Sequence, residues 1–469
     1  MKKSAAFLTL GCKVNSYETE AMRGMFEAAG YEIVDFKELA DVYVVNTCTV
    51  TNIADRKSRQ MLHQAKKRNP QAIIAAVGCY VQAAEEVLLA DNAVDLVIGN
   101  NKKSDIVRMV EQCRTSNGKE ELVVDINSEK DYEELHVITT MEKTRAFIKI
   151  QDGCNRFCSY CIIPFVRGRV RSRKEEDILG EIRELSKKGY KEIVLTGIHI
   201  SSYGSDLLKR TTEQIEQTSD TEAMIELSNQ DTDVYDRLSC EMPLARLIVS
   251  IGGIEGIERI RLGSLEPRII TEKFLEAIAS VKQFCPHFHL SLQSGSDSVL
   301  KRMNRKYSAG EYFDRVQLIR RFFENPSFTT DVIVGFPGET PEEFEQTMTF
   351  VKSIGFSHIH VFKYSKRAGT KAAMMSDQIP EDIKTVRSDE LIALSNLMSE
   401  EYHSRFLGKI EKVLFEESVE ISGKKYQVGH NERYLKLAVE GDTDLANELL
   451  EGRVIRFLSD ELLLCEIIN

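Results

Sequence analysis

The chain has 469 residues, of which 42% are hydrophobic and 29% are charged, as in an ordinary soluble protein of about three domains. Its formal net charge of −11 argues against a general nucleic-acid binder, although residues 205–241 alone contain ten acids and three bases. No apolar run reaches the roughly 18 residues of a membrane span, so we expect no membrane segment and a cytoplasmic location.

Residues 1–115 alternate short β-rich apolar runs with helical patterns. We expect strands at 6–10, 42–46, 72–77 and 94–98, and helices at 17–29 and 53–68. This alternation predicts βαβ units and a parallel sheet in an N-terminal α/β domain. Residues 116–142 are polar and without pattern, so we expect a linker there.

Residues 143–380 form a second α/β series. Strands are expected at 146–150, 192–196, 259–262, 287–292, 330–334 and 358–362, with helical patterns between most of them. Six strands with crossover helices predict an open, partial (β/α)6 barrel. The acidic stretch 205–241 interrupts this series, and we expect a mobile surface insertion.

The last part of the chain is predicted to be a connecting helix at 381–407, followed by a small β-barrel at 408–469. Five short strand-like pieces in about sixty residues are typical of a nucleic-acid-binding barrel. Because 13 acids and 8 bases lie in 408–469, any RNA contact there would be local, around Lys424, Lys425, Arg433, Tyr434 and Lys436.

Three cysteines, Cys154, Cys158 and Cys161, follow the first barrel strand with the spacing C-x3-C-x2-C. Loops at the C-terminal ends of barrel strands hold the active sites of such folds. Three thiolates can hold three irons of a four-iron cluster and leave the fourth iron open to a substrate. A zinc knuckle is the alternative, but it needs a fourth ligand nearby, and the next histidine is His199.

A second set, Cys12, Cys48 and Cys79, follows three successive predicted strands of the N-terminal domain. Because the carboxyl ends of parallel strands share one sheet edge, we expect these three cysteines to converge. The alternative is three unrelated core cysteines, since a free cysteine packs well in apolar surroundings.

Four stretches carry a resemblance to a known family: Leu10-Gly11-Cys12-Lys13-Val14-Asn15, Asn46-Thr47-Cys48-Thr49, Val77-Gly78-Cys79-Tyr80 and Gln151-Asp152-Gly153-Cys154. The chain resembles the methylthiotransferases among the radical S-adenosylmethionine enzymes. The resemblance implies two [4Fe-4S] clusters, one on each cysteine trio, and S-adenosylmethionine as cofactor. It also implies tRNA as partner, an electron donor of the flavodoxin or ferredoxin type, and a C-terminal TRAM barrel.

The resemblance also places two further residues near S-adenosylmethionine, while no catalytic side chain is assigned. Tyr160 matches the aromatic position near the adenine, with ordinary loop packing as the alternative. Gly197, in Leu195-Thr196-Gly197-Ile198-His199, matches the motif that binds the amino group. The arginines Arg167, Arg169, Arg171 and Arg173 are candidate contacts for RNA phosphate or for the cofactor's carboxylate. His287, His289, His358 and His360 are expected to be packing or rim residues.

The surroundings of Cys12 are similar to the family branch that acts on threonylcarbamoyl-adenosine in tRNA. The resemblance therefore implies an enzyme that inserts a methylthio group at carbon 2 of this base at position 37, next to the anticodon. A branch acting on isopentenyl-adenosine tRNA or on a ribosomal protein side chain is the alternative. A non-catalytic iron–sulfur RNA-binding protein is the alternative from another class.

Overall fold

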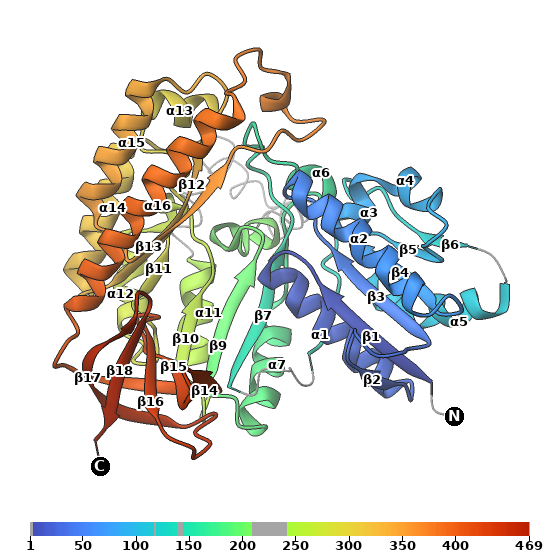
Figure 1. Cartoon of the computed structure of the whole chain (residues 1–469), viewed down its shortest axis with the longest axis horizontal. Helices are drawn as coiled ribbons and strands as arrows, with labels where there is room; N and C mark the ends of the chain where they lie inside the picture. The colour runs from blue at the N-terminus through green and yellow to red at the C-terminus, as the bar shows by residue number, and fades with distance from the viewer. Residues whose placement is uncertain (1–2, 117–118, 138–143, 209–241, 469) are drawn as a thin grey trace, which may run out of the picture.

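The computed structural model describes residues 3–116, 119–137, 144–208 and 242–468. An N-terminal α/β unit, an open barrel and a small closed β-barrel lie side by side (Figure 1). Within these ranges no helix is long and apolar enough to cross a membrane. The predicted α/β fold class is confirmed.

The N-terminal sheet is parallel, with six strands in the order β2 (Glu32–Val34), β1 (Ser4–Thr9), β3 (Val42–Thr47), β4 (Ile73–Gly78), β5 (Leu96–Ile98) and β6 (Glu120–Leu122). Helices α1 (Lys13–Ala28) and α5 (Ile106–Ser116) cover one face. Helices α2 (Asn52–Arg68), α3 (Cys79–Ala83) and α4 (Glu85–Leu89) cover the other. Burial on both faces explains why the central strands are continuously apolar.

The expected linker at 116–142 needs a correction. Residues Glu120–Leu122 form β6, which pairs in parallel with β5 as the edge strand of the sheet. Farther along, Ile126, Leu135 and Val137 are buried. A three-residue edge strand with two glutamates carries no apolar pattern, so it could not be predicted from the local sequence.

The central unit has six parallel strands: β7 (Arg145–Asp152), β9 (Glu192–Gly197), β10 (Arg259–Leu262), β11 (His287–His289), β12 (Ser327–Val334) and β13 (His358–Lys363). Single bridges, Ile260 to Phe284 and Leu265 to Leu290, join the β10 and β11 edges of its two sheets. A short antiparallel strand, β8 (Arg171–Ser172), is added beside β7. The sheet therefore curves into the open, partial barrel that was predicted.

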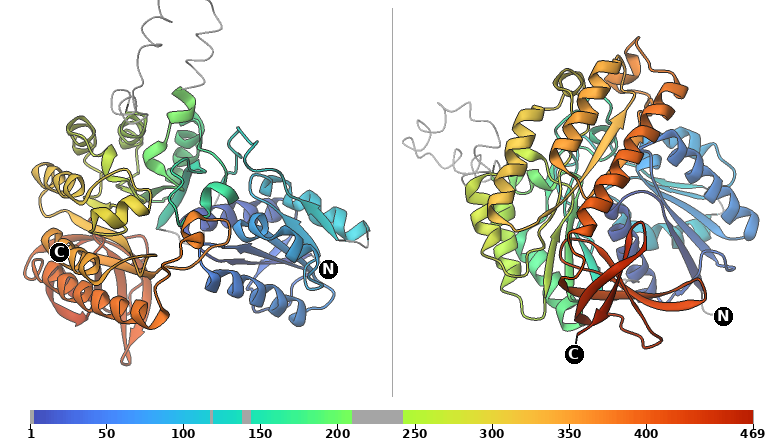
Figure 2. Two further views of the ribbon diagram at one scale, coloured as in Figure 1. Left: turned by 90° about the horizontal axis from the view of Figure 1, so that it is seen from above. Right: turned by 60° about the vertical axis from the view of Figure 1, so that its left-hand side comes forward.

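Helices line the outside of this barrel (Figure 2): α7 (Glu175–Lys187), α11 (Pro243–Gly252), α12 (Glu272–Ala279), α13 (Asp297–Arg302), α14 (Ala309–Phe322), α15 (Pro341–Ile354) and α16 (Glu381–Ser404). Reciprocal capping boxes start two of them, Ser308 with Glu311 on α14 and Thr340 with Glu343 on α15. Helix α11 was not expected. Of the predicted acidic insertion, residues 209–241 lie outside the described part of the chain.

The C-terminal unit is a closed barrel with the strand order β14 (Ile410–Ile421), β15 (Lys424–His430), β16 (Lys436–Glu440), β18 (Leu462–Ile467) and β17 (Leu449–Ser459). It covers the N-terminal ends of the central strands, where Arg259 donates to the carbonyls of His430 and Lys412 at 2.7 and 2.5 Å. The Tyr434 ring stacks on His430 and His287, with centroids 4.4 and 5.2 Å apart.

Two arginines complete this floor of the central barrel. Arg261 and Arg145 lie 4.8 and 5.5 Å from the centre of the Tyr434 ring. Arg433 donates from Nε to the Asn325 carbonyl at 3.0 Å. Both side chains serve the contact between the two barrels and also line the large cavity, and the expected RNA contacts at Arg433 and Tyr434 stay predictions.

Candidate active site

The first cysteine trio lies at the carboxyl edge of the N-terminal sheet. Cys12 is the N-cap of α1, Cys48 follows β3, and Cys79 is the first residue of α3 after β4. A Cβ on Gly11, whose φ is +105°, would lie 2.9 Å from the Cys48 Sγ, so only glycine lets this loop approach. Burial raises the pKa of Cys48 to about 11, and Cys79 and Cys12 add to the rise.

The second trio lies in the loop between β7 and the short helix α6 (Ile163–Val166). Burial raises the pKa of Cys154 to about 11, and the neighbouring Cys158 contributes to the rise. The Arg156 backbone N–H donates to the Cys154 Sγ at 3.4 Å. Arg305 donates from Nη1 to the Cys158 Sγ at 3.3 Å, a contact that no sequence pattern indicated.

The spacing of the sulfurs tests which metal group suits the two trios. All six cysteines are free thiols. Among the described residues, only His289, Asp331 and His360 have ligand atoms that all lie within 4.8 Å of one another, so both cysteine trios are more widely spaced. A single tetrahedral zinc would bring its sulfur ligands to about 3.8 Å from one another. The wider spacing suits three corners of a four-iron cluster.

A buried ion network connects the first trio to the barrel. Arg167 is fully buried and donates from Nε to the Cys79 Sγ at 3.1 Å. Its other nitrogens reach Asn15 at 2.7 Å and Glu18 at 2.8 Å. Burial opposes the charge on Glu18, but Arg167, Lys103 and Lys149 outweigh it and hold the pKa of this carboxyl well below its usual range.

The arginines near the second trio were expected to meet RNA or the cofactor, and for three of them this is wrong. Arg167, Arg171 and Arg173 are buried. Arg173 pairs with Glu181 and, at 3.0 Å, with Glu134, and Arg171 donates to the Arg167 carbonyl at 2.9 Å. Only Arg169 is exposed, over the Phe157 ring. A run of arginines in a sequence does not reveal buried partners elsewhere in the chain.

Tyr160 lies within the loop of the second trio, and Gly197 ends β9, the strand that pairs with β7. The Tyr160 ring meets Phe336 edge-on at 6.4 Å and packs with the apolar cluster around that residue. Gly197 ends β9 against the Gln151 carbonyl, which a Cβ would approach to 2.9 Å. His199, in the same motif, is held by Glu266 at 2.9 Å and Ser202 at 2.7 Å.

A cavity of about 590 Å³ runs through the inside of the open barrel, a size typical of ligand sites. Cys12 lines it on one side, and Gly197 and Ile163, which follows the second trio, line it on another. The histidines predicted to be packing or rim residues also line it, and Tyr434 lies at the floor. The cavity therefore reaches from Cys12 to Ile163, two residues after the second cysteine trio.

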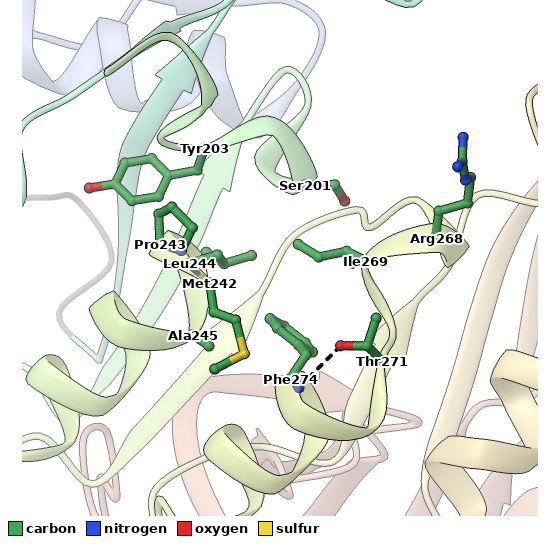
Figure 3. Close-up of a pocket in the computed structure, with 10 residues that line it drawn as sticks. All are labelled: Ser201, Tyr203, Met242, Pro243, Leu244, Ala245, Arg268, Ile269, Thr271 and Phe274. Carbon is green, nitrogen blue, oxygen red and sulfur yellow. Dashed lines mark hydrogen bonds between the residues drawn. The ribbon is translucent and has the colours of Figure 1, made fainter. Parts of the chain in front are cut away.

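A second, much smaller pocket lies beside α11 and α12 (Figure 3). Its walls are mostly apolar, with Met242, Leu244 and Phe274 among them, and Thr271 caps α12 by accepting from the Phe274 backbone N–H. Its volume of about 10 Å³ holds at most one water. It is a packing gap.

Comparisons with known proteins agree with this geometry. The model of the Radical SAM superfamily matches residues 148–351, and that of uncharacterized protein family UPF0004 matches residues 4–99. The threonylcarbamoyladenosine tRNA methylthiotransferase MtaB of Bacillus subtilis is 39% identical, with 98% of both chains covered. MtaB of Aquifex aeolicus is 38% identical, covering 90% of this chain and 95% of its own.

More distant relatives show how far the likeness extends. The tRNA-2-methylthio-N(6)-dimethylallyladenosine synthase of Clostridium botulinum is 35% identical over 96% of this chain and 93% of its own. Among solved structures, the radical S-adenosylmethionine methyltransferase TsrM of Kitasatospora setae aligns with a TM-score of 0.54. It shares 13% identity over 80% of this chain and 77% of its own, so it supports the fold alone.

Proposed function

Since this chain belongs to the methylthiotransferase family of radical S-adenosylmethionine enzymes, we propose that it adds a methylthio group to carbon 2 of N(6)-threonylcarbamoyladenosine at position 37 of tRNA. The observation that carries this proposal is one cavity that reaches from Cys12 to Gly197 and to Ile163, which follows the second cysteine trio. Sulfur insertion into an unactivated C–H bond needs a sulfur source and a radical source on either side of one base.

The cofactors are [4Fe-4S] clusters and S-adenosylmethionine; when bound, S-adenosylmethionine would supply the methyl group and the reactive radical, and the auxiliary cluster would supply or present the sulfur. We propose Cys12, Cys48 and Cys79 as ligands of the auxiliary cluster, and Cys154, Cys158 and Cys161 as ligands of the cluster that binds S-adenosylmethionine. Tyr160 and Gly197 are proposed to flank the cofactor. Gly197 fits this part because it lines the cavity.

The chain's own residues position these groups and control water. Arg167 and Arg305 donate to Cys79 and Cys158, and such N–H···S contacts stabilise thiolates and tune the potential of a cluster. The C-terminal barrel closes the floor of the cavity through Tyr434, which limits water around a reactive intermediate. A flavodoxin or ferredoxin is proposed as electron donor, and the cytoplasm as the location.

Nucleoside mass analysis of tRNA from a strain lacking this gene tests the substrate. We expect the methylthio derivative of threonylcarbamoyladenosine to disappear, and the unmodified precursor to accumulate. The wild-type gene should restore it, whereas Cys154→Ala and Cys48→Ala should not. An unchanged level of the derivative in the deletion strain contradicts the proposal. Loss of the isopentenyl-adenosine derivative instead would identify the alternative tRNA substrate.

A reconstitution separates an enzyme from a non-catalytic iron–sulfur protein. The reduced holoenzyme with S-adenosylmethionine should release 5′-deoxyadenosine and contain about eight irons, as two four-iron clusters require. Changing Cys12, Cys48 and Cys79 together to alanine should leave about four. Absence of 5′-deoxyadenosine from protein with both clusters would favour the non-catalytic alternative.

A further inference from the structure

One end of the large cavity is polar and lies directly beside Cys12. Lys13, the first residue of α1, lines it together with His289, Asp331 and His360 of the barrel wall. The side chain of Lys13 is exposed, and its ammonium lies 5.7 Å from the centre of the Phe147 ring. A cation therefore stands next to the first cysteine trio, at the boundary between the two domains.

The register of three neighbouring strands explains the wall opposite Lys13. Asp331 of β12 is the direct partner of His360 on β13, and Thr329 is the partner of His289 on β11. Alternate residues of one strand share a face, so Thr329 and Asp331 point to the same side. The Thr329 hydroxyl meets His289 Nδ1 at 3.0 Å, and Asp331 meets His289 Nε2 at 3.3 Å.

In this wall, His360 lies within the electrostatic reach of Lys13. Burial lowers the pKa of His360, and the charge of Lys13 lowers it further. Burial also lowers the pKa of His287, followed in size by the effects of Arg261, His289 and Lys13. The ammonium of Lys13 is thus close enough to act on both histidines, and His360 is neutral at pH 7.

Two other full cations, Arg433 and Lys436, line the cavity among the described residues. Arg433 bonds to the carbonyls of Asn325 and Glu324 at 3.0 and 3.2 Å, and Lys436 lies 3.7 Å from Glu417. Both belong to the C-terminal barrel. Lys13 is therefore the cation at the Cys12 end, and the N-terminus of the 16-residue helix α1 adds positive potential there.

The chemistry of the proposed substrate matches this arrangement. In adenine, carbon 2 and the N6-bearing carbon flank the same ring nitrogen, so a base that turns carbon 2 toward Cys12 also brings its N6 substituent to that side. On threonylcarbamoyladenosine this substituent ends in a carboxylate. We propose that Lys13 binds the threonyl carboxylate and is a specificity-determining residue, an inference that rests on the proposed function.

The test uses anticodon stem-loop RNAs that carry either threonylcarbamoyladenosine or its methyl ester, which has the same shape without the negative charge. The wild-type holoenzyme should bind and methylthiolate the acid about 10- to 100-fold better than the ester, as expected for a charge-assisted hydrogen bond. Lys13→Met should lose this preference by weakening only the acid. Lys436→Met is the matched control, a lysine of the same cavity that should keep the preference.

The readouts are KM, the dissociation constant from fluorescence anisotropy, and the iron content, which should stay at the wild-type value in Lys13→Met. If this variant keeps the acid-over-ester preference, the proposal is wrong. Equal weakening of acid and ester would also overturn it, because Lys13 would then contact the RNA backbone. If wild-type enzyme modifies neither RNA while releasing 5′-deoxyadenosine, the proposed function fails instead.

Discussion

Replacing Arg167 with methionine should damage both the stability of the chain and its auxiliary cluster. The guanidinium is fully buried and joins Cys79, Asn15 and Glu18 of the N-terminal unit to Asp152 of the barrel. Burial opposes its charge, but Asp152, Cys79 and Glu18 raise the pKa of Arg167 well above its usual range. Methionine keeps much of the volume and removes every one of these contacts.

The magnitude follows from what is left behind. Glu18 and Asp152 would keep Lys149 at 2.8 and 2.6 Å, and Glu18 would keep Lys103 at 3.2 Å, but each carboxylate would lose its contacts to Arg167. Breaking a buried ion pair costs about 3–5 kcal/mol. The lost hydrogen bond to a charged Cys79 thiolate is worth about 1.5–3 kcal/mol, or roughly 10- to 100-fold in cluster affinity.

Two measurements check this reasoning, with Arg173→Met as the matched control. Denaturant unfolding should show a similar loss of stability for both variants, because Arg173 is equally buried and paired with Glu181 and Glu134. Iron content and electron paramagnetic resonance should show a weakened auxiliary cluster only in Arg167→Met. Arg167→Lys should restore part of the stability. A normal auxiliary cluster in Arg167→Met, with an unchanged spectrum, would refute this role of Arg167.

Three further results are expected. Burial holds the pKa of His287 well below its usual range, so only the unfolded chain gains this proton below about pH 6.5. As the pH is lowered below about 6.5, the free energy of unfolding should therefore decrease by up to about 1.4 kcal/mol per pH unit. His287→Gln should flatten this slope in unfolding curves, and an unchanged slope would contradict the prediction. Tyr434→Ala should cost about 2–3 kcal/mol of stability through lost stacking and cation–π contacts. Tyr434→Phe keeps the ring and loses only the hydrogen bond that the hydroxyl accepts from Arg145, so it should cost less, and equal melting temperatures for all three proteins would contradict this. Arg305→Met should shift the midpoint potential of the cluster at Cys158 without lowering total iron, whereas Lys306→Met should leave it unchanged; a potential unmoved by Arg305→Met rules out the contact.

Periodicity in the sequence was enough to predict the fold class, because buried parallel strands and amphipathic helices leave local patterns. The strand at Arg259–Leu262 was predicted to the residue, and so was the first residue of α16. Strand β6 and helix α11 were not predicted. Strand β6 is a polar edge strand, and α11 follows the acidic stretch without a polar N-cap residue. Boundaries also depend on tertiary contacts that a local pattern does not carry.

In the candidate site too, local features could be predicted and tertiary contacts could not. The convergence of Cys12, Cys48 and Cys79 at one sheet edge could be expected, since strand ends are local features. The partners of Arg167 could not, because Asn15, Glu18 and Cys79 lie 88 to 152 positions away along the chain. The cavity wall of His289, Asp331 and His360 depends on strand register, which one sequence does not reveal.

The way in which Tyr434 sits on the floor of the central barrel bears on how these enzymes can be recombined. Its loop inserts between arginines that belong to β7 and β10, so the C-terminal barrel supplies part of the wall around the reaction space. A hybrid that joins this catalytic unit to the tail of a relative would have to exchange both halves of that contact together. Grafting a tail that lacks this ring would leave Arg145 and Arg261 without the aromatic surface they pack against.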